Sequence, residues 1–347
     1  MIVDVKLHWL PKDLFAEESQ FNSFIRCVPQ AYGEDVNLTT IPGTKWRQAI
    51  VSRPKGYQNL NFNERETFSI DRIQAINEAK IDKAILRMPC WQEWLTLDLC
   101  KQVNTELAAS VREHPDRFLG MAVIPPWGDK DCIFELERCV KDLGFKAVEV
   151  AAHYGNLYLD DEKFRPYLKK LHELNVTVCV HHTPLPVEYN YIYQYSNVRR
   201  FYGRCIDQMT ALTRILFSGM LEELPNLKLV HTMLGGGFFA YVNMLLPEQT
   251  GMQEDIQRFD TGIDKIRGFL KRNIYFDISH AQPWGKPQLE CAVKTLGADH
   301  IVWGSSYPLR HEWLYKGPDY IRSLDIGEKE KELILGKNAQ ELFKIED

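Results

Sequence analysis

The sequence lacks several features that would assign it to a specialised class. None of its eight cysteines forms a Cys-x-x-Cys pair, and several lie inside apolar runs, as Cys179 does between valines. Scattered thiols are typical of a reducing compartment rather than of a disulfide framework. No apolar stretch approaches the length of a membrane span, and no signal peptide is visible. We therefore expect a cytoplasmic protein with no membrane partner.

Charge of one sign is not concentrated anywhere in the chain. The net charge is −5 over 347 residues and no basic run or stripe is present, so we expect no nucleic-acid partner. A glycine-rich phosphate-binding turn after the first strand is also missing. Gly235-Gly236-Gly237 follows a predicted strand, but no G-x-G-x-x-G motif surrounds it, which argues against a nucleotide-binding sheet.

The chain does contain a repeated strand and helix pattern. Apolar runs that predict strands begin near residues 2, 83, 118, 145, 176, 227, 274 and 301, and helical patterns separate most of them. Strands that are apolar on both faces and alternate with helices indicate a parallel sheet that is buried on both sides. We predict one α/β domain over residues 1–347, a (β/α)₈ TIM barrel. A doubly wound open sheet is the alternative.

Two segments depart from this pattern. Residues 11–65 show no clear periodicity and predict a long loop or small subdomain inserted after strand one. Arg47 and Arg53 lie in it and could reach a substrate carboxylate, or could simply be solvated at the surface. Residues 184–206 follow strand five and are rich in tyrosine and arginine, including Arg199. This segment suits a lid over an aromatic anion, or alternatively a dimer contact.

The first strand, Ile2 to Leu10, carries unusual polar residues. A period of two places Asp4, Lys6 and His8 on one face. An ammonium group and an imidazole at the end of a buried strand are costly unless a site uses them. Five of the ten histidines fall at or near predicted strand ends, which is where barrels carry their chemistry. The strand ends carry Lys6, His8, Glu149, His181, His182, His231, Met233, Asp277, His280, Ser305 and Ser306.

A series of short motifs runs in order along nearly the whole chain. They are Asp71-Arg72-Ile73, Ala84-Ile85-Leu86, Val103-Asn104-Thr105-Glu106-Leu107, His114-Pro115-Asp116-Arg117-Phe118, Gly144 to Val150, Leu159 to Phe164, Phe217-Ser218-Gly219, Pro225 to Val230, Leu234 to Gly237, Trp303 to Pro308 and Asn338-Ala339. In this order the chain resembles the amidohydrolase-related decarboxylases, which include aminocarboxymuconate-semialdehyde decarboxylase and γ-resorcylate decarboxylase. The resemblance implies a carbon–carbon lyase or hydrolase of the amidohydrolase superfamily, a small carboxylated aromatic or cyclic substrate, and a homodimer.

The resemblance also implies a metal site, which this sequence keeps only in part. The family typically holds one divalent ion, often zinc, through His-x-His on strand one, a histidine on strand five and an aspartate after strand eight. His8 and His181 match two of these ligands, whereas Lys6 replaces the first histidine and Ser306 the aspartate. Met233 stands where the family has its catalytic histidine. We therefore expect a divergent member that lacks several metal-ligand residues.

These replacements lead us to expect no cofactor. A zinc site needs at least three good ligands, and an ammonium group at close range adds roughly 4 kcal/mol of repulsion at an effective dielectric near 20. His8 and His181 would be ligands only if a metal is present. In its place Lys6 could clamp a carboxylate, act as a base or act as a Schiff-base nucleophile, and His231 could serve as the general base.

The predicted site follows from these assignments. Glu149 could neutralise Lys6, although the two could instead form a purely structural buried ion pair. A conventional zinc or manganese enzyme with a rearranged ligand set drawn from Glu149, His231 or His280 is one rival, and a non-catalytic binding relative is another. The predicted catalytic residues are Lys6, His8, Glu149, His181, His231 and Ser306. The predicted substrate contacts are Arg47, Arg53, His182, Arg199, Met233 and Tyr307.

Overall fold

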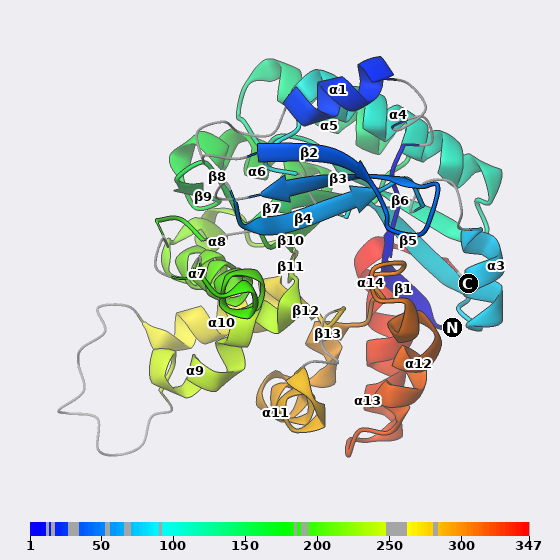
Figure 1. Ribbon diagram of the computed structural model, residues 1–347. Coiled ribbons are helices and arrows are strands. Elements are labelled where there is room, and N and C mark those ends of the chain that lie inside the picture. Colours follow the sequence, from blue (N-terminus) through cyan, green and yellow to red (C-terminus); the bar gives the residue numbers. More distant parts are fainter. Residues whose placement is uncertain are drawn as a thin grey trace.

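Eight parallel strands form the central sheet of the computed structural model (Figure 1). The structure describes residues 1–11, 14, 18–26, 35–52, 56–65, 71–89, 92–183, 186–188, 192, 194–247, 262–279 and 284–346. The barrel strands are β1 (Val3–His8), β5 (Lys83–Arg87), β6 (Phe118–Val123), β7 (Ala147–Ala151), β10 (Thr177–His181), β11 (Leu229–His231), β12 (Ile274–Asp277) and β13 (Ile301–Val302).

The sheet closes on itself. Its strand order is β1-β5-β6-β7-β10-β11-β12-β13, and the two end strands meet through backbone hydrogen bonds. Val5 N donates to Trp303 O at 3.1 Å, and His8 N donates to Tyr307 O at 2.8 Å. The predicted TIM barrel is therefore confirmed, and the open sheet is excluded.

Helices surround the barrel and cover the outer faces of its strands (Figure 1). Several helices begin at side-chain caps, as α5 does at Asp129, which accepts a hydrogen bond from Cys132 N. None of the described helices is long and apolar enough to cross a membrane. The larger ones are α3 (Arg72–Glu78), α4 (Leu97–Glu113), α5 (Lys130–Lys141), α6 (Arg165–Leu174), α7 (Gly203–Phe217), α9 (Phe238–Leu245), α10 (Ile263–Asn273), α11 (Lys286–Leu296) and α12 (His311–Arg322).

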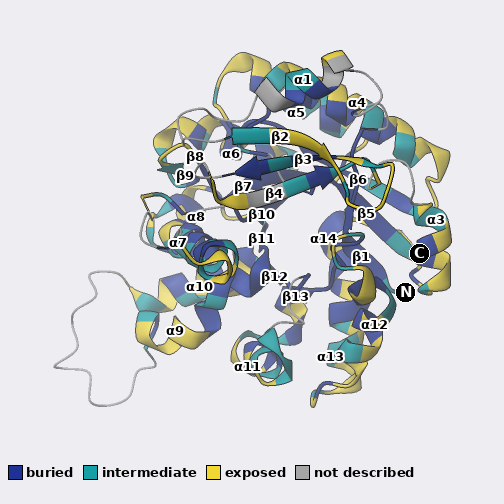
Figure 2. Ribbon diagram, in the orientation of Figure 1, coloured by how far each residue is buried: buried dark blue, intermediate teal, exposed yellow. Residues whose placement is uncertain are grey.

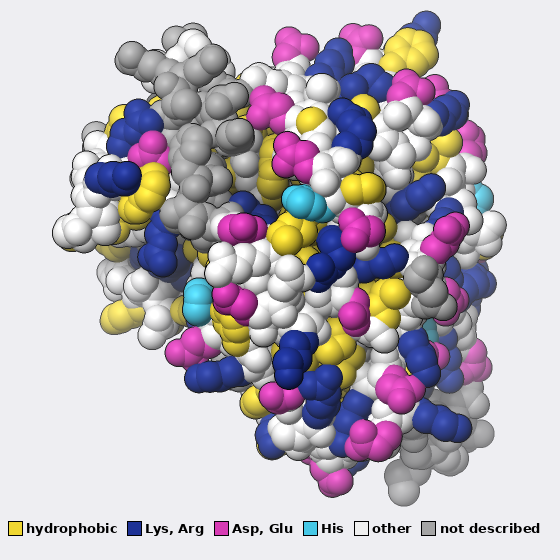
Figure 3. Space-filling view, turned by 90° about the vertical axis from the view of Figure 1, so that its right-hand side faces the viewer, with side chains coloured by type: hydrophobic (Ala, Val, Ile, Leu, Met, Phe, Trp, Pro, Cys, Tyr) yellow, Lys and Arg dark blue, Asp and Glu magenta, His cyan; other side chains and the backbone are white. Residues whose placement is uncertain are grey.

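The core has two parts. The larger lies between the strands and the surrounding helices, and Figure 2 shows the strands as predominantly buried. The smaller fills the barrel itself with side chains such as Val5, Ile85 and Cys179, and the terminal helix α14 (Asn338–Phe343) packs Leu342 and Phe343 against it. The amino-terminal end of the barrel is thus filled, so polar groups can gather only toward the opposite end. On the face shown in Figure 3, charges of both signs are interspersed.

The segment after β1 contains regular structure that its sequence did not indicate. It holds α1 (Glu18–Arg26) and an antiparallel sheet of β2 (Asp35–Thr40), β3 (Arg47–Ser52) and β4 (Gln58–Asn63). These strands are rich in polar residues and β2 is largely exposed, so they lack the apolar runs that identify the barrel strands. Arg199 Nη2 donates to Gln58 O at 2.6 Å, which joins this sheet to the segment after β10.

Within residues 184–206, the described part includes a π-helical turn, η4 (Val198–Tyr202), that continues directly into α7. The helix α7 therefore begins at Gly203, inside this segment.

Candidate active site

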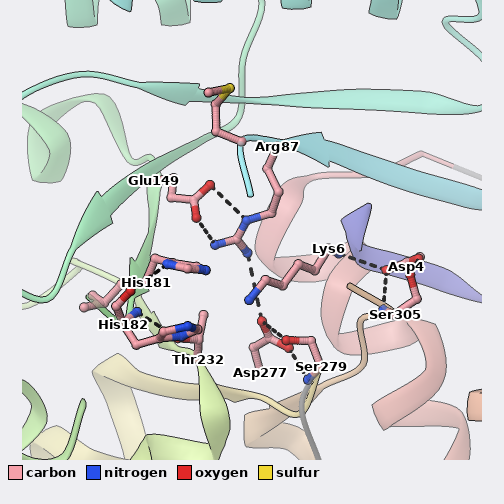
Figure 4. Close-up of polar contacts among 12 residues, drawn as sticks. Asp4, Lys6, Arg87, Glu149, His181, His182, Thr232, Asp277, Ser279 and Ser305 are labelled. Carbon is pink, nitrogen blue, oxygen red and sulfur yellow. Dashed lines mark hydrogen bonds and ion pairs between the residues drawn. The ribbon is translucent and has the colours of Figure 1, made fainter. Parts of the chain in front are cut away.

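A β-bulge in the first strand determines where Lys6 points. Asp4 pairs with Ala84 and Leu7 pairs with Leu86, so three steps along β1 match two along β5. The bulge breaks the period of two. Figure 4 shows the Lys6 side chain extending toward Arg87 and Asp277, whereas Asp4 lies on the other side beside Ser305. The expectation that Asp4 shares a face with Lys6 is therefore wrong.

Asp4 instead fixes the local backbone. Its carboxylate accepts hydrogen bonds from Lys6 N at 2.9 Å and Ser305 N at 2.8 Å, and a further one from Ser305 Oγ. Burial raises the pKa of Asp4 to about 6, although these hydrogen bonds oppose that shift. The neighbouring strand approaches closely here, since a Cβ on Gly304 would lie 2.8 Å from Lys6 Cβ. Only glycine at this position leaves room for the Lys6 stem.

Lys6 belongs to a cluster of four charged side chains with no exposed surface. Arg87 Nε and Nη2 donate to Glu149 at 3.0 and 2.5 Å, and Arg87 Nη1 lies 4.0 Å from Asp277 Oδ2. Because the Glu149 carboxylate is hydrogen-bonded to Arg87, the expected ion pair between Lys6 and Glu149 does not form. Asp277 is instead the carboxylate that most favours the charged form of Lys6. Burial nevertheless lowers the pKa of Lys6 to about 8, and raises the pKa of Glu149 despite Arg87.

The sequence contained a signal for Arg87 that our reasoning missed. It is the one arginine in an otherwise apolar strand end, Ala84 to Met88, and it is fully buried. A buried guanidinium requires a paired carboxylate. That requirement, applied to Arg87, would have predicted a buried carboxylate beside it.

Several polar atoms around Lys6 have no hydrogen-bond partner among the described residues. They are Lys6 Nζ, Arg87 Nη1, Ser306 Oγ and both ring nitrogens of His8, all completely buried. Buried donors without partners are rare and costly, at about 1–3 kcal/mol each. The cluster therefore presents donors suited to a bound ligand.

The two histidines beside the cluster are held neutral. Burial lowers the pKa of His8 well below its usual value, and the positive charges of Lys6 and Arg87 add to this. The pKa of His181 is lowered in the same way, first by burial and then by His182 and Lys6. His181 Nδ1 lies 2.8 Å from His182 O and its ring stacks on that of His182 at 4.1 Å. Figure 4 shows the His181 ring pointing toward Arg87.

Residues 92–345 match the family model described as amidohydrolase. The chain belongs to the amidohydrolase family. It is 25% identical over 281 residues to 2-amino-3-carboxymuconate-6-semialdehyde decarboxylase of Dictyostelium discoideum, covering 79% of this chain and 76% of the relative. It is 26% identical over 265 residues to γ-resorcylate decarboxylase of a Polaromonas species, covering 72% and 77%. The predicted class, a decarboxylase-like carbon–carbon lyase or hydrolase of this superfamily, is confirmed.

Solved structures share the fold of this amidohydrolase. A 5-carboxyvanillate decarboxylase from Novosphingobium aromaticivorans, 19% identical, superposes with a TM-score of 0.76 over 99% of this chain and 96% of that one. A 2,6-dihydroxybenzoate decarboxylase complexed with 2,6-dihydroxybenzoate, 20% identical, superposes with a TM-score of 0.72 and covers 99% of both chains.

The expectation of no cofactor is wrong. The Novosphingobium enzyme is crystallised with manganese, and so is a dihydroxybenzoic acid decarboxylase from Polaromonas that superposes with a TM-score of 0.70 at 19% identity. The side chains of this amidohydrolase do not fit such an ion as they stand. Within the described ranges, no three His, Cys, Asp or Glu side chains converge on one point. Lys6 and Arg87 also place two positive charges beside His8 and His181.

Other predicted residues of this amidohydrolase lie apart from the cluster. His231 Nδ1 lies 3.1 Å from Gln208 Oε1 of α7, and burial lowers the pKa of His231 to about 3. Since Val230 packs inside the barrel, His231 points outward, away from the charged cluster that the predicted general base would serve. Met233 lines an apolar pocket of about 460 Å³ between α7 and α9. Tyr307 lines a separate cavity of about 800 Å³.

The predicted arginines do not gather at the cluster either. Arg47 is 44% exposed and pairs with Glu64 at 3.0 Å. Arg199 is buried and its guanidinium lies 5.3 Å from the Tyr57 ring centre. Arg53 and His280 lie outside the described residues. The structure therefore brings together Lys6, His8, Glu149, His181, His182 and Ser306 with Arg87 and Asp277.

Proposed function

We propose that this amidohydrolase is a decarboxylase that acts on a small aromatic carboxylate and binds the carboxylate group between Lys6 and Arg87. The observation that carries the proposal is the set of buried donors without partners, Lys6 Nζ, Arg87 Nη1 and Ser306 Oγ. A carboxylate is an acceptor-only group that would satisfy donors of this kind. The relatives named for decarboxylation of carboxymuconate-semialdehyde and γ-resorcylate support this class of substrate.

The electrostatics favour Lys6 as a carboxylate clamp over the other roles considered for it. With a pKa of about 8, its side chain is mainly an ammonium ion at neutral pH, and as such it is neither a base nor a nucleophile. Glu149 is occupied by two nitrogens of Arg87 and does not compete for Lys6. A charge-assisted hydrogen bond from Lys6 to the substrate is worth about 1.5–3 kcal/mol.

Substitution of Lys6 tests the proposal. We expect Lys6→Met to lower kcat/KM for carbon dioxide release from 2,6-dihydroxybenzoate or a related hydroxybenzoate by about 10- to 100-fold. Lys101→Met is the matched control, because Lys101 lies on the exposed side of α4. Assays are run with and without added manganese, so that any dependence of turnover on the metal is measured separately from the effect of the substitution. Unchanged turnover in Lys6→Met contradicts the clamp, and binding without any turnover in the wild type supports a non-catalytic relative.

We also infer a homodimer located in the cytoplasm. Four apolar side chains of η4 and α9 are exposed by 41–73%, and such a patch supports an interface between two copies of the chain. The patch consists of Phe201, Tyr202, Tyr241 and Met244. We expect the Met244→Glu variant to sediment as a monomer and the wild type to sediment as a dimer. The free, mostly buried cysteines support a reducing compartment.

A further inference from the structure

A histidine that sequence reasoning did not select is paired with a carboxylate beyond the end of β7. His153 begins the short strand β8 (His153–Tyr154), and its Nδ1 lies 2.7 Å from Asp207 Oδ1 on α7. A carboxylate only accepts hydrogen bonds, so Nδ1 carries the proton. Among the described residues, Nε2 of His153 has no hydrogen-bond partner, although the residue is only 2% exposed.

Asp207, which holds this ring, accepts four hydrogen bonds. Besides His153, it accepts from Thr183 N and Thr183 Oγ1, each at 2.9 Å, and from Tyr158 Oη at 3.3 Å. The carboxylate has no exposed surface. It therefore fixes both the tautomer and the orientation of His153, which leaves Nε2 as the atom available to a ligand.

His153 lies at the same end of the barrel as the charged cluster. Ala151 pairs with His181 in the register of β7 and β10, and Thr183 Oγ1 lies 3.3 Å from His153 Nδ1. Along the same chain, His153 follows Glu149 by four residues, about 13 Å at 3.3 Å per residue. Glu149, which holds Arg87, and His153 therefore follow one another along the chain toward the barrel mouth.

The surroundings of His153 differ from those of the other histidines near the mouth. His8 and His181 face the positive charges of Lys6 and Arg87, and His231 is turned toward Gln208. His153 faces a carboxylate instead. It can therefore accept a hydrogen bond at Nε2 while Asp207 balances the charge that such a bond draws onto the ring.

We propose that His153, positioned by Asp207, binds a hydroxyl group on the substrate ring opposite the carboxylate and thereby sets substrate specificity. This inference rests on the proposed function, because the carboxylate at Lys6 and Arg87 orients the ring. A site that hydrogen-bonds a hydroxyl favours the hydroxylated compound over the analogue that lacks it, because the analogue cannot form that hydrogen bond.

The test is a comparison of benzoate, 4-methylbenzoate and 4-hydroxybenzoate by isothermal titration. We expect the wild type to prefer 4-hydroxybenzoate over both others by about tenfold. His153→Phe removes the preference, and His153→Gln, whose amide retains hydrogen-bonding capacity, keeps part of it. Tyr158→Phe is the matched control, because it removes one hydrogen bond to Asp207 and keeps the aromatic ring that packs against His153, and it retains the preference.

Two further results separate this inference from the proposed function. A preference for 4-hydroxybenzoate that persists in both His153 variants overturns the role of His153, even when Lys6→Met weakens the binding of all three compounds. Conversely, loss of the preference in His153→Phe together with unchanged binding in Lys6→Met supports the hydroxyl contact and overturns the Lys6 clamp. Thermal melting of each variant shows whether it is folded. If His153→Phe is not folded, the comparison of the three compounds is made with His153→Gln.

Discussion

Replacing one member of the Arg87–Glu149 pair by an apolar side chain is expected to destabilise the protein strongly. The two side chains have no exposed surface and are joined by hydrogen bonds of 3.0 and 2.5 Å. Removing one partner of such a pair costs about 3–5 kcal/mol, because the other charge stays buried. In Glu149→Met, Asp277 lies 4.0 Å from Arg87 Nη1 and compensates part of the charge. We therefore expect Glu149→Met to lower the free energy of unfolding by about 3 kcal/mol, near the lower end of this range.

The two single variants should respond differently to pH. In Arg87→Met, the remaining Glu149 can take up a proton, and burial already raises its pKa in the intact protein. When the pKa of a carboxyl is higher in the folded protein than in the unfolded protein, protonation of that carboxyl stabilises the folded state at a pH below the unfolded pKa. This stabilisation is lost as the pH rises through the folded pKa. The cost of Arg87→Met should therefore be smaller at pH 5 than at pH 8. Arginine stays charged, so the cost of Glu149→Met should not fall in this range.

Urea unfolding of the wild type, both single variants and the double variant Arg87→Met/Glu149→Met measures these costs. Two methionines restore an apolar interior, so the double variant should lose less than the sum of the single losses. Additive losses, or single losses under about 1 kcal/mol, would refute the reasoning that the buried charges depend on each other.

Three further predictions follow from the site. Binding of a benzoate should weaken as pH rises through about 8, because Lys6 then loses the charge that attracts the carboxylate; titration calorimetry between pH 6.5 and 9.5 measures this. Gly304→Ala should cost about 1–3 kcal/mol of stability in a urea titration, because the new methyl group would lie 2.8 Å from Lys6 Cβ. Asp207→Ala should lower the melting temperature more than Tyr158→Phe does, because it leaves several buried donors unpaired, whereas Tyr158→Phe removes a donor together with its hydrogen bond.

The barrel was predictable because its signal is local. Each strand is a short apolar run, and helices between the runs require parallel strands buried on both faces. The sheet β2–β3–β4 was missed because its strands are rich in polar residues and partly exposed, and their pairing rather than their composition defines them. Patterns within one segment predict elements, but they do not predict which exposed segments pair.

The site could be predicted only where its residues lie at the ends of barrel strands, because these ends meet on one side of the barrel. Lys6, Glu149 and His181 were expected together, and they are together. The partner of Glu149 was assigned wrongly because Arg87 lies 62 residues away in the sequence, and only the register of the barrel brings the two into contact. His231 was expected to serve the cluster as a general base, but it points outward because Val230 points into the barrel, a direction that the sequence does not reveal.

The bulge in β1 makes the first strand sensitive to chain length rather than to side-chain identity. Before the bulge, Val3 and Val5 pack inside the barrel, and after it His8 pairs with Arg87 at the mouth. Deleting one residue between Asp4 and Leu7 would remove the bulge and leave both halves on their present faces, because Asp4 would stay opposite Ala84 and Leu7 opposite Leu86. Even pairing at the present length would instead turn one half of the strand inside out. The strand would then keep either its apolar floor or its charged mouth.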